Sequence, residues 1–363
     1  MSDLDADAEV DVAEQISLEE LQLAARNHAM PLEALRYEIT PAGLHYLLIH
    51  YDIPAVGLGA WRIEIGGRVR VPISLSLDDL RARPATTAPV TLECAGNGRA
   101  RLSPRPVSQP WIVEAVGTAE WTGTPLRPLL EEAGLEDDAA DVVFAGLDRG
   151  IEGGVDQRYE RSLSVAEALR DDVLLAYEMN GQPLPPQHGF PLRLIVPGWY
   201  GMTQVKWLHR VTVVDRPFEG YQMARAYRVW NAEDEPGEPL TRIAPRALMV
   251  PPGIPEFMSR RRIVAAGRQA VEGRAWSGWG PIVRVEVSVD GGAAWADASV
   301  GAAPGPSAWH PWSFTWDATA LGDHELCVRA TDSEGNTQPL DQAWNLKGYA
   351  NNEVHRVPVT VQP

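Results

Sequence analysis

One short loop holds the residues best suited to metal or redox chemistry. It runs Glu93-Cys94-Ala95-Gly96-Asn97-Gly98-Arg99. A cysteine followed by small, loop-forming residues has space above it, and Gly96 and Gly98 let the backbone turn tightly beside a ligand. Arg99 and Arg101 add positive charge that lowers the pKa of a thiol, and a thiolate is a soft ligand for a redox metal. By itself the loop indicates either a ligating, reactive cysteine or a buried structural one.

Length and composition place this loop in a globular protein of two domains. The chain has 363 residues, too many for one ordinary core, and it is 45% hydrophobic and 22% charged. Its net charge of −17 and pI near 4.9, with no basic stripe, exclude a nucleic-acid binder. No apolar run could span a bilayer, and the acidic N-terminus shows no export signal, so we expect a cytoplasmic protein without membrane contact.

The sequence also excludes several common kinds of site. The two cysteines, Cys94 and Cys327, are too few for a disulfide scaffold and too far apart for a zinc site. There is no Walker sequence, no Gly-x-Gly-x-x-Gly between a strand and a helix, and no Cys-x-x-Cys-His motif, so we expect no haem. We expect Cys327, in an alternating strand, to be a core residue. Four further histidines are expected to be structural or exposed: His45, His209, His310 and His324.

Two regions of different secondary structure follow an acidic tail and short helix at residues 1–30, where Ser17 and Glu20 form a capping box. Residues 31–235 mix short apolar runs such as 192–196 and 211–214 with helical pieces at 125–133 and 164–170, which predicts an α+β domain. Residues 236–363 contain alternating runs at 283–289, 312–316 and 324–330 with turn residues between them. This pattern predicts an immunoglobulin-like β-sandwich.

Several motifs in register, from about Pro31 to the end, resemble the sulfite oxidase family of molybdenum-cofactor oxidoreductases. The Cys94 loop resembles the family's cofactor-cysteine loop. Further matches are residues 188–198 (His-Gly-Phe-Pro-Leu-Arg-Leu-Ile-Val-Pro-Gly), 205–208 (Val-Lys-Trp-Leu), 275–278, 285–288, 344–348 (Trp-Asn-Leu-Lys-Gly) and 355–357. Many long motifs in the same order are far more specific than any one of them.

The resemblance implies a molybdenum ion held by the dithiolene of one molybdopterin and by the Cys94 thiolate. It also implies that four further residues contact the pterin or its phosphate: His50, His188, Arg193 and Lys206. Their side chains suit an anionic cofactor rich in hydrogen-bonding groups. The sandwich domain would mediate homodimerisation. The organic cofactor and metal would carry out the electron chemistry, while the protein binds and orients them.

Substrate residues follow from the same resemblance. Arg99, Trp111 and Tyr227 match residues of the family's anion pocket, and Lys347 stands where many members have arginine. Lysine keeps the charge but loses the bidentate fork of arginine. A larger departure is Leu48, which replaces an arginine that usually lines the substrate pocket. The pocket therefore has one cation fewer than the family pattern.

These residues predict an enzyme that transfers an oxygen atom to or from a small oxyanion, with sulfite oxidised to sulfate as the first expectation. Electrons would pass to a separate partner such as a cytochrome. One alternative is a reductase of the same fold, acting on nitrate or an S-oxide, and the missing arginine keeps it open. A second is a binding protein that keeps the fold without the metal. A secreted, disulfide-stabilised adhesion module is disfavoured by the cysteine count.

Overall fold

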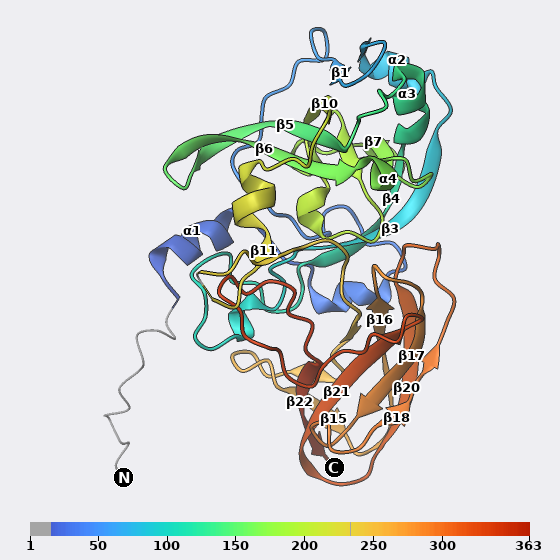
Figure 1. Cartoon of the computed structure of the whole chain (residues 1–363). Coiled ribbons are helices and arrows are strands. Elements are labelled where there is room, and N and C mark those ends of the chain that lie inside the picture. The colour runs from blue at the N-terminus through green and yellow to red at the C-terminus, as the bar shows by residue number, and fades with distance from the viewer. Residues whose placement is uncertain (1–15, 233) are drawn as a thin grey trace.

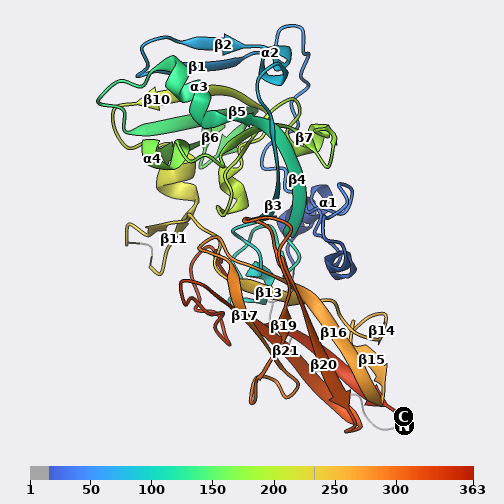
Figure 2. The same ribbon diagram turned by 90° about the vertical axis from the view of Figure 1, so that its right-hand side faces the viewer.

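The computed structural model describes residues 16–232 and 234–363, and the acidic run from Asp5 to Asp11 lies outside them. Figures 1 and 2 show two parts, with the N-terminal part above and a C-terminal sandwich of strands below. The α+β character expected for the first part and the β-sandwich expected for the second are both present. No helix in the described part of the chain has the length and apolar character needed to cross a bilayer.

The first sheet of the N-terminal part has the strand order β2-β1-β10-β5-β6. β1 and β10 run parallel, whereas the remaining neighbours are antiparallel. The strands are β1 (Ile63–Gly67), β2 (Ile73–Leu75), β5 (Asp141–Glu152), β6 (Val155–Ser164) and β10 (Leu208–Val214). The long β5–β6 hairpin extends beyond the sheet on the left of Figure 1. Its far end reaches the site described below.

The second sheet carries the cysteine loop. Its strands are β3 (Thr86–Glu93), β4 (Val116–Pro125), β7 (Leu174–Met179), β8 (Gln182–Pro183) and β9 (Arg193–Ile195). They pair antiparallel in the order β3-β4-β7-β8, and β9 also pairs with β7. The last four residues of β3 are all buried. Cys94 therefore follows directly on a strand that is fixed on both faces.

The helices are short, as expected from a chain with thirty prolines. The capping box at Ser17 and Glu20 is present and begins a nine-residue helix. Pro125 and Ser164 occupy the N-cap positions of the two helices expected after them. The helices are α1 (Leu18–Arg26), η2 (Leu32–Arg36), α2 (Leu77–Arg81), η3 (Arg99–Arg101), α3 (Leu126–Ala133), α4 (Val165–Ala168), η4 (Pro186–His188), η5 (Gly201–Thr203) and the π-helix η6 (Gln222–Ala226).

The C-terminal part consists of two sheets, in the orders β13-β16-β20-β19 and β14-β15-β22-β21-β17-β18. Apolar side chains from both sheets form one core between them. The strands are β13 (Arg246–Met249), β14 (Ile254–Pro255), β15 (Arg262–Ala265), β16 (Gly267–Trp276), β17 (Ile282–Ser288), β18 (Ala296–Asp297), β19 (Ser299–Val300), β20 (His310–Ala318), β21 (Gly322–Asp332) and β22 (His355–Gln362).

The two parts share apolar packing where they meet. Leu248, Val250, Trp276 and Trp309 from the second part belong to the main core of the first. The boundary expected between residues 235 and 236 falls in the connection between β11 (Arg228–Val229) and β12 (Glu238–Pro239), which pair with each other. The domain limits themselves stay a prediction.

Cys327 is buried, as expected for a residue of the alternating strand β21. Its neighbours Leu326 and Val328 join the sandwich core, but Cys327 does not. Its sulfur instead lies 3.7 Å from Nη1 of Arg356, on the other face of the sheet. Burial raises the pKa of this thiol to about 11, so it is an unreactive buried residue.

Candidate active site

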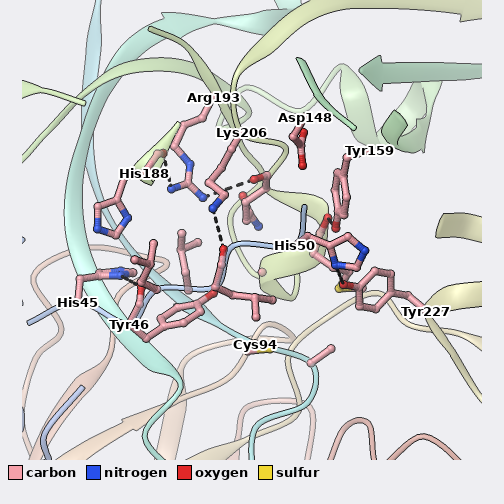
Figure 3. Close-up of a pocket in the computed structure, with 17 residues that line it drawn as sticks. His45, Tyr46, His50, Cys94, Asp148, Tyr159, His188, Arg193, Lys206 and Tyr227 are labelled. Atoms are coloured by element: carbon pink, nitrogen blue, oxygen red, sulfur yellow. Dashed lines mark hydrogen bonds between the residues drawn. The ribbon is translucent and has the colours of Figure 1, made fainter. Parts of the chain in front are cut away.

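The cofactor residues expected from the sequence meet in one pocket of the N-terminal part. Its volume is about 680 Å³, including the open space at its mouth. Cys94 lies at the lower side of the pocket in Figure 3, with His188, Arg193 and Lys206 on one side and His50 and Tyr227 on the other. Six of the nine expected site residues line this pocket: His50, Cys94, His188, Arg193, Lys206 and Tyr227.

The loop that presents Cys94 is held by the asparagine within it. Nδ2 of Asn97 donates to Oε1 of Glu93 and to the carbonyl oxygen of Val113, both at 2.9 Å. Gly98 adopts φ +92°, a left-handed conformation that glycine takes without strain. Burial raises the pKa of the Cys94 thiol, against the opposing effects of the Gly96 backbone and the Arg99 charge. A metal ion at this position would therefore have to displace the thiol proton itself.

A second anchor ties the same loop to the C-terminal part. Nε of Arg246 lies 2.8 Å from Oε1 of Glu93, and both side chains are 2% exposed. The indole N–H of Trp276 donates to Oε2 of Glu93 at 2.8 Å. Since Glu93 precedes the cysteine directly, residues of β13 and β16 help to set where the thiol points.

One end of the pocket, here called the cationic end, consists of His188, Arg193 and Lys206. Nζ of Lys206 donates to the carbonyl oxygens of Leu48 and Gln187 at 2.7 and 3.2 Å. Nη1 of Arg193 donates to the carbonyl oxygen of His188 at 3.0 Å. Burial and, to a smaller extent, the charge of Arg193 together lower the pKa of Lys206 to about 7, against the charge of Asp148. Within the described residues, neither Arg193 nor Lys206 forms an ion pair, so this end suits an anion.

Three buried polar atoms of the pocket lack a hydrogen-bond partner in the described structure. They are Nε2 of His45, Nε of Arg193 and Oδ1 of Asp148. Buried polar atoms are nearly always paired, so unpaired ones on residues that line a cavity are consistent with a polar ligand. Burial raises the pKa of Asp148 to about 6, against the charge of Lys206. Donors, acceptors and positive charge are thus arranged around one space.

The opposite end, here called the tyrosine end, contains His50, Tyr159 and Tyr227. The hydroxyl of Tyr227 lies 3.5 Å from Nδ1 of His50. Nε2 of His50 lies 3.0 Å from a carboxylate oxygen of Glu152 at the end of β5. Tyr227 follows directly on the π-helix η6, a rare element that is frequent at functional sites. Figure 3 shows these three rings on the side of the pocket away from Arg193.

The other three expected site residues, Arg99, Trp111 and Lys347, lie outside this pocket lining. Arg99 is buried, and its Nε donates to the carbonyl oxygen of Lys347 at 2.8 Å. Nζ of Lys347 donates to the carbonyl oxygens of Arg225 and Ala226, just before Tyr227. Trp111 packs in the small cluster that contains Cys94, and its indole acts to lower the pKa of that thiol. These three side chains therefore pack next to Cys94 and next to the segment that ends at Tyr227, outside the pocket lining.

The pocket fits molybdopterin by its donor set. Cys94 is the one cysteine among the residues that line the space, and the lining also holds Arg193 and Lys206, whose side chains suit an anionic phosphate. Among the described residues no three His, Cys, Asp or Glu side chains gather closely enough to hold a metal ion by themselves. A metal at Cys94 would therefore take its remaining ligands from the cofactor, and the buried unpaired atoms of His45 and Arg193 would meet its ring and phosphate.

Comparison with known proteins agrees with this geometry. Residues 50–222 match the oxidoreductase molybdopterin binding domain, and residues 248–362 match the Mo-co oxidoreductase dimerisation domain. The chain is 38% identical to sulfite oxidase of Gallus gallus over 343 residues, covering 88% of this chain and 72% of that protein. This chain belongs to the sulfite oxidase family of molybdenum-cofactor oxidoreductases. Its N-terminal part is a molybdopterin-binding domain.

Other relatives carry the names of enzymes with different activities. Mitochondrial sulfite oxidase of Mus musculus is 36% identical over 90% of this chain, which spans 62% of that protein. Nitrate reductase (NADH) 1 of Oryza sativa subsp. japonica is 34% identical over 91% of this chain, which spans 39% of that protein. The sulfane dehydrogenase SoxCD of Paracoccus pantotrophus has a similar structure, with a TM-score of 0.78, 27% identity, and coverage of 92% of this chain and 86% of that one.

Sequence reasoning missed several residues of the site. His45, expected to be structural or exposed, is buried and lines the pocket, 5.6 Å from the ring of His188. Its ring fits because Gly117 leaves room, since a Cβ there would lie 2.6 Å from the imidazole. Asp148 and Glu152 stand on β5, and nothing in their local sequence distinguishes them from surface carboxylates. The sequence held one partial indication of the role of His45, because it lies only five residues before His50.

Proposed function

We propose that this protein is a molybdenum-dependent oxidoreductase that oxidises sulfite to sulfate and passes the electrons to a separate redox protein. The supporting observation is one pocket lined both by Cys94 and by Arg193 and Lys206, neither of which forms an ion pair within the described residues. The balanced reaction takes sulfite and water to sulfate, two protons and two electrons. When bound, the molybdenum cofactor supplies the oxygen atom and accepts both electrons.

The chain's own residues bind and orient in this reaction. Arg193 and Lys206 hold the anionic part of the cofactor, because neither forms an ion pair with a carboxylate of the described residues. Cys94 fixes the metal, and the loop around it is held through Glu93 by Arg246 and Trp276. Arg99 adds positive potential near the thiol, which favours an oxyanion substrate. Tyr227 borders the space where that substrate would react.

The first test is the molybdenum content of the purified protein, with Cys94→Ser as the matched control. We expect near one molybdenum per native chain, and turnover of sulfite with an artificial acceptor. Cys94→Ser should abolish turnover while circular dichroism shows an unchanged fold, since serine is isosteric but is not a soft ligand. An active serine variant would contradict the mechanism. Absence of molybdenum, from a host that makes the cofactor, would favour a binding protein that keeps the fold.

Reduction of nitrate or of an S-oxide is a second candidate. The specific observation is Leu48, which lines the pocket at its half-buried position and leaves that wall apolar. A pocket with one cation fewer binds a dianion less tightly and suits a singly charged or neutral substrate. Assays with nitrate or a sulfoxide and a reduced dye, beside sulfite and an acceptor, separate the two. A kcat/KM at least about tenfold higher in the reductive direction would replace the first proposal.

We further propose that the protein is a homodimer formed through residues 248–362. The support is the match of these residues to a dimerisation domain. Light scattering on the purified chain should give about twice the chain mass of 39.7 kDa. A single-chain mass at micromolar concentration would contradict this part of the proposal.

A further inference from the structure

The carboxylate of Glu152 collects three hydrogen bonds at the edge of the pocket. Its Oε2 atom lies 3.0 Å from Nε2 of His50, 2.7 Å from the hydroxyl of Tyr51 and 2.9 Å from Nε2 of Gln222. Burial alone would raise the pKa of Glu152, but the interactions with His50, Tyr51 and Gln222 prevail and hold this pKa at about 2. The group is therefore an anion over the physiological range.

An ionised carboxylate only accepts hydrogen bonds, which fixes the form of the histidine. Nε2 of His50 has to carry a hydrogen, because it faces Oε2 of Glu152. Nδ1 then faces the hydroxyl of Tyr227 at 3.5 Å and accepts from it when the imidazole is neutral. The order Glu152, His50, Tyr227 is the arrangement by which a carboxylate orients a histidine toward a hydroxyl group.

The turn of the β5–β6 hairpin places Glu152 at the edge of the pocket. Glu152 and Val155 pair across a two-residue turn, in which Gly153 and Gly154 have φ +60° and +75°. A Cβ on Gly153 would lie 3.1 Å from the ring of Tyr221. The hairpin end is thus seated beside the start of the π-helix η6, and the same segment continues to Tyr227.

Exposure increases in steps along these three side chains. Tyr227 is 7% exposed, whereas the side chains of His50 and Glu152 are 24% and 29% exposed. The first borders the pocket and the last two reach water. A chain of groups with this gradient can carry protons from a closed site to solvent, which the proposed oxidation requires because it releases two protons.

We propose that Glu152 is a positioning residue that fixes His50 with Nδ1 toward Tyr227, so that Tyr227 and His50 form the exit path for protons from the pocket. The inference rests on the proposed function for the source of the protons, although the positioning itself does not. For each proton, the O–H bond of Tyr227 breaks as an N–H bond forms at Nδ1 of His50. Tyr227 regains a proton from the pocket, and the imidazolium releases the proton at Nδ1 to water, which reaches the partly exposed ring, while Nε2 keeps its hydrogen bond to Glu152.

Other ionisable groups lie around His50 and contribute to the pH dependence of its protonation. The second carboxylate is Asp148, whose pKa the charge of His50 acts to lower. The remaining groups that face His50 are tyrosines from three elements, and burial raises the pKa of each: Tyr51, Tyr159 and Tyr227. The charge of Lys347 interacts with Glu152. Of these, Glu152 contacts Nε2 of the imidazole at 3.0 Å, and Tyr227 faces Nδ1 at 3.5 Å.

The test is Glu152→Gln, which keeps the shape and removes the charge. The matched control is Asp156→Asn, on the same hairpin, whose partner is the exposed Arg149. We expect kcat for sulfite to fall about tenfold with KM within twofold, as for outer groups that orient a catalytic histidine. The acid limb of the kcat/KM profile should move to lower pH, because an imidazolium next to a neutral amide is less stable. The control should match the native enzyme.

A second measurement does not depend on activity. In protein labelled with ¹⁵N-histidine, His50, identified by its loss in His50→Gln, should show a protonated Nε2 and an unprotonated Nδ1 at high pH. Glu152→Gln should shift this signal toward mixed tautomers and lower its midpoint. If neither the tautomer nor the kinetics changes, the proposal is wrong. If sulfite and nitrate are not turned over at all but the tautomer shifts, the proposed function fails while the positioning by Glu152 stands.

Discussion

The two ends of the pocket differ in how their ionisable side chains are paired. At the cationic end, Arg193 and Lys206 are fixed by backbone carbonyl oxygens and no carboxylate pairs with them among the described residues. At the tyrosine end, His50 is paired with Glu152 and both are partly exposed to water. Buried charge without a partner is costly and persists only where a ligand of opposite charge binds. One end is therefore suited to hold an anion permanently, and the other to gain and lose protons.

The largest expected effect comes from breaking the anchor of the Cys94 loop, which lies between the two ends. Arg246→Met leaves Glu93 as a buried anion without its 2.8 Å partner. Removing one partner of a buried ion pair costs about 3–5 kcal/mol of unfolding free energy. Urea denaturation of the cofactor-free protein measures this loss, and Arg268→Met, an exposed arginine, is the control. A loss under about 1 kcal/mol would mean that the loop at Cys94 is held by its own hydrogen bonds.

The next largest effect is expected from a substitution at the cationic end of the pocket. Arg193→Met removes a buried cation that has a free Nε and no ion pair in the described structure. We expect the molybdenum content to fall at least about tenfold, because truncating one member of a buried charge pair costs roughly 2–5 kcal/mol of binding. The cofactor-free variant should be no less stable than the native chain. If it instead unfolds readily while keeping its molybdenum, Arg193 is structural and the comparison of the two ends fails.

The smallest effect is a pH dependence of the cofactor-free protein. Burial lowers the pKa of Lys206 from 10.5 to about 7, so between these values the unfolded chain binds a proton that the folded chain does not. Stability should therefore rise with pH from about 7 toward 10 and level off below about 7, where both states bind the proton. Differential scanning calorimetry should show this rise to be smaller in Lys206→Met, by about 2–4 °C between pH 7 and 9. If the melting temperature changes equally with pH in both proteins, the lowered pKa of Lys206 is contradicted.

Local pattern predicted much of the architecture. The capping box at Ser17, the helix after Pro125 and the strands of the sandwich all appear where alternation and turn residues placed them. The same local information marked the Cys94 loop, because small residues around a cysteine are visible without any tertiary contact. The motifs that carried the resemblance added His50, His188, Arg193, Lys206 and Tyr227, which all line the pocket. Their roles toward a cofactor stay predictions.

What the sequence by itself determined was the set of elements, the cysteine loop and the family. Only the tertiary structure decided that Glu152, 102 residues from His50, accepts its hydrogen bond, and that Arg246 of the second part pairs with Glu93 of the first. It also showed that Arg99 and Lys347 lie outside the pocket lining and donate to backbone carbonyl oxygens, while their roles toward a substrate stay predictions. The reason is physical: propensity and periodicity act over a few residues, whereas a charged side chain acquires its role from whichever distant group strand register and domain packing place beside it.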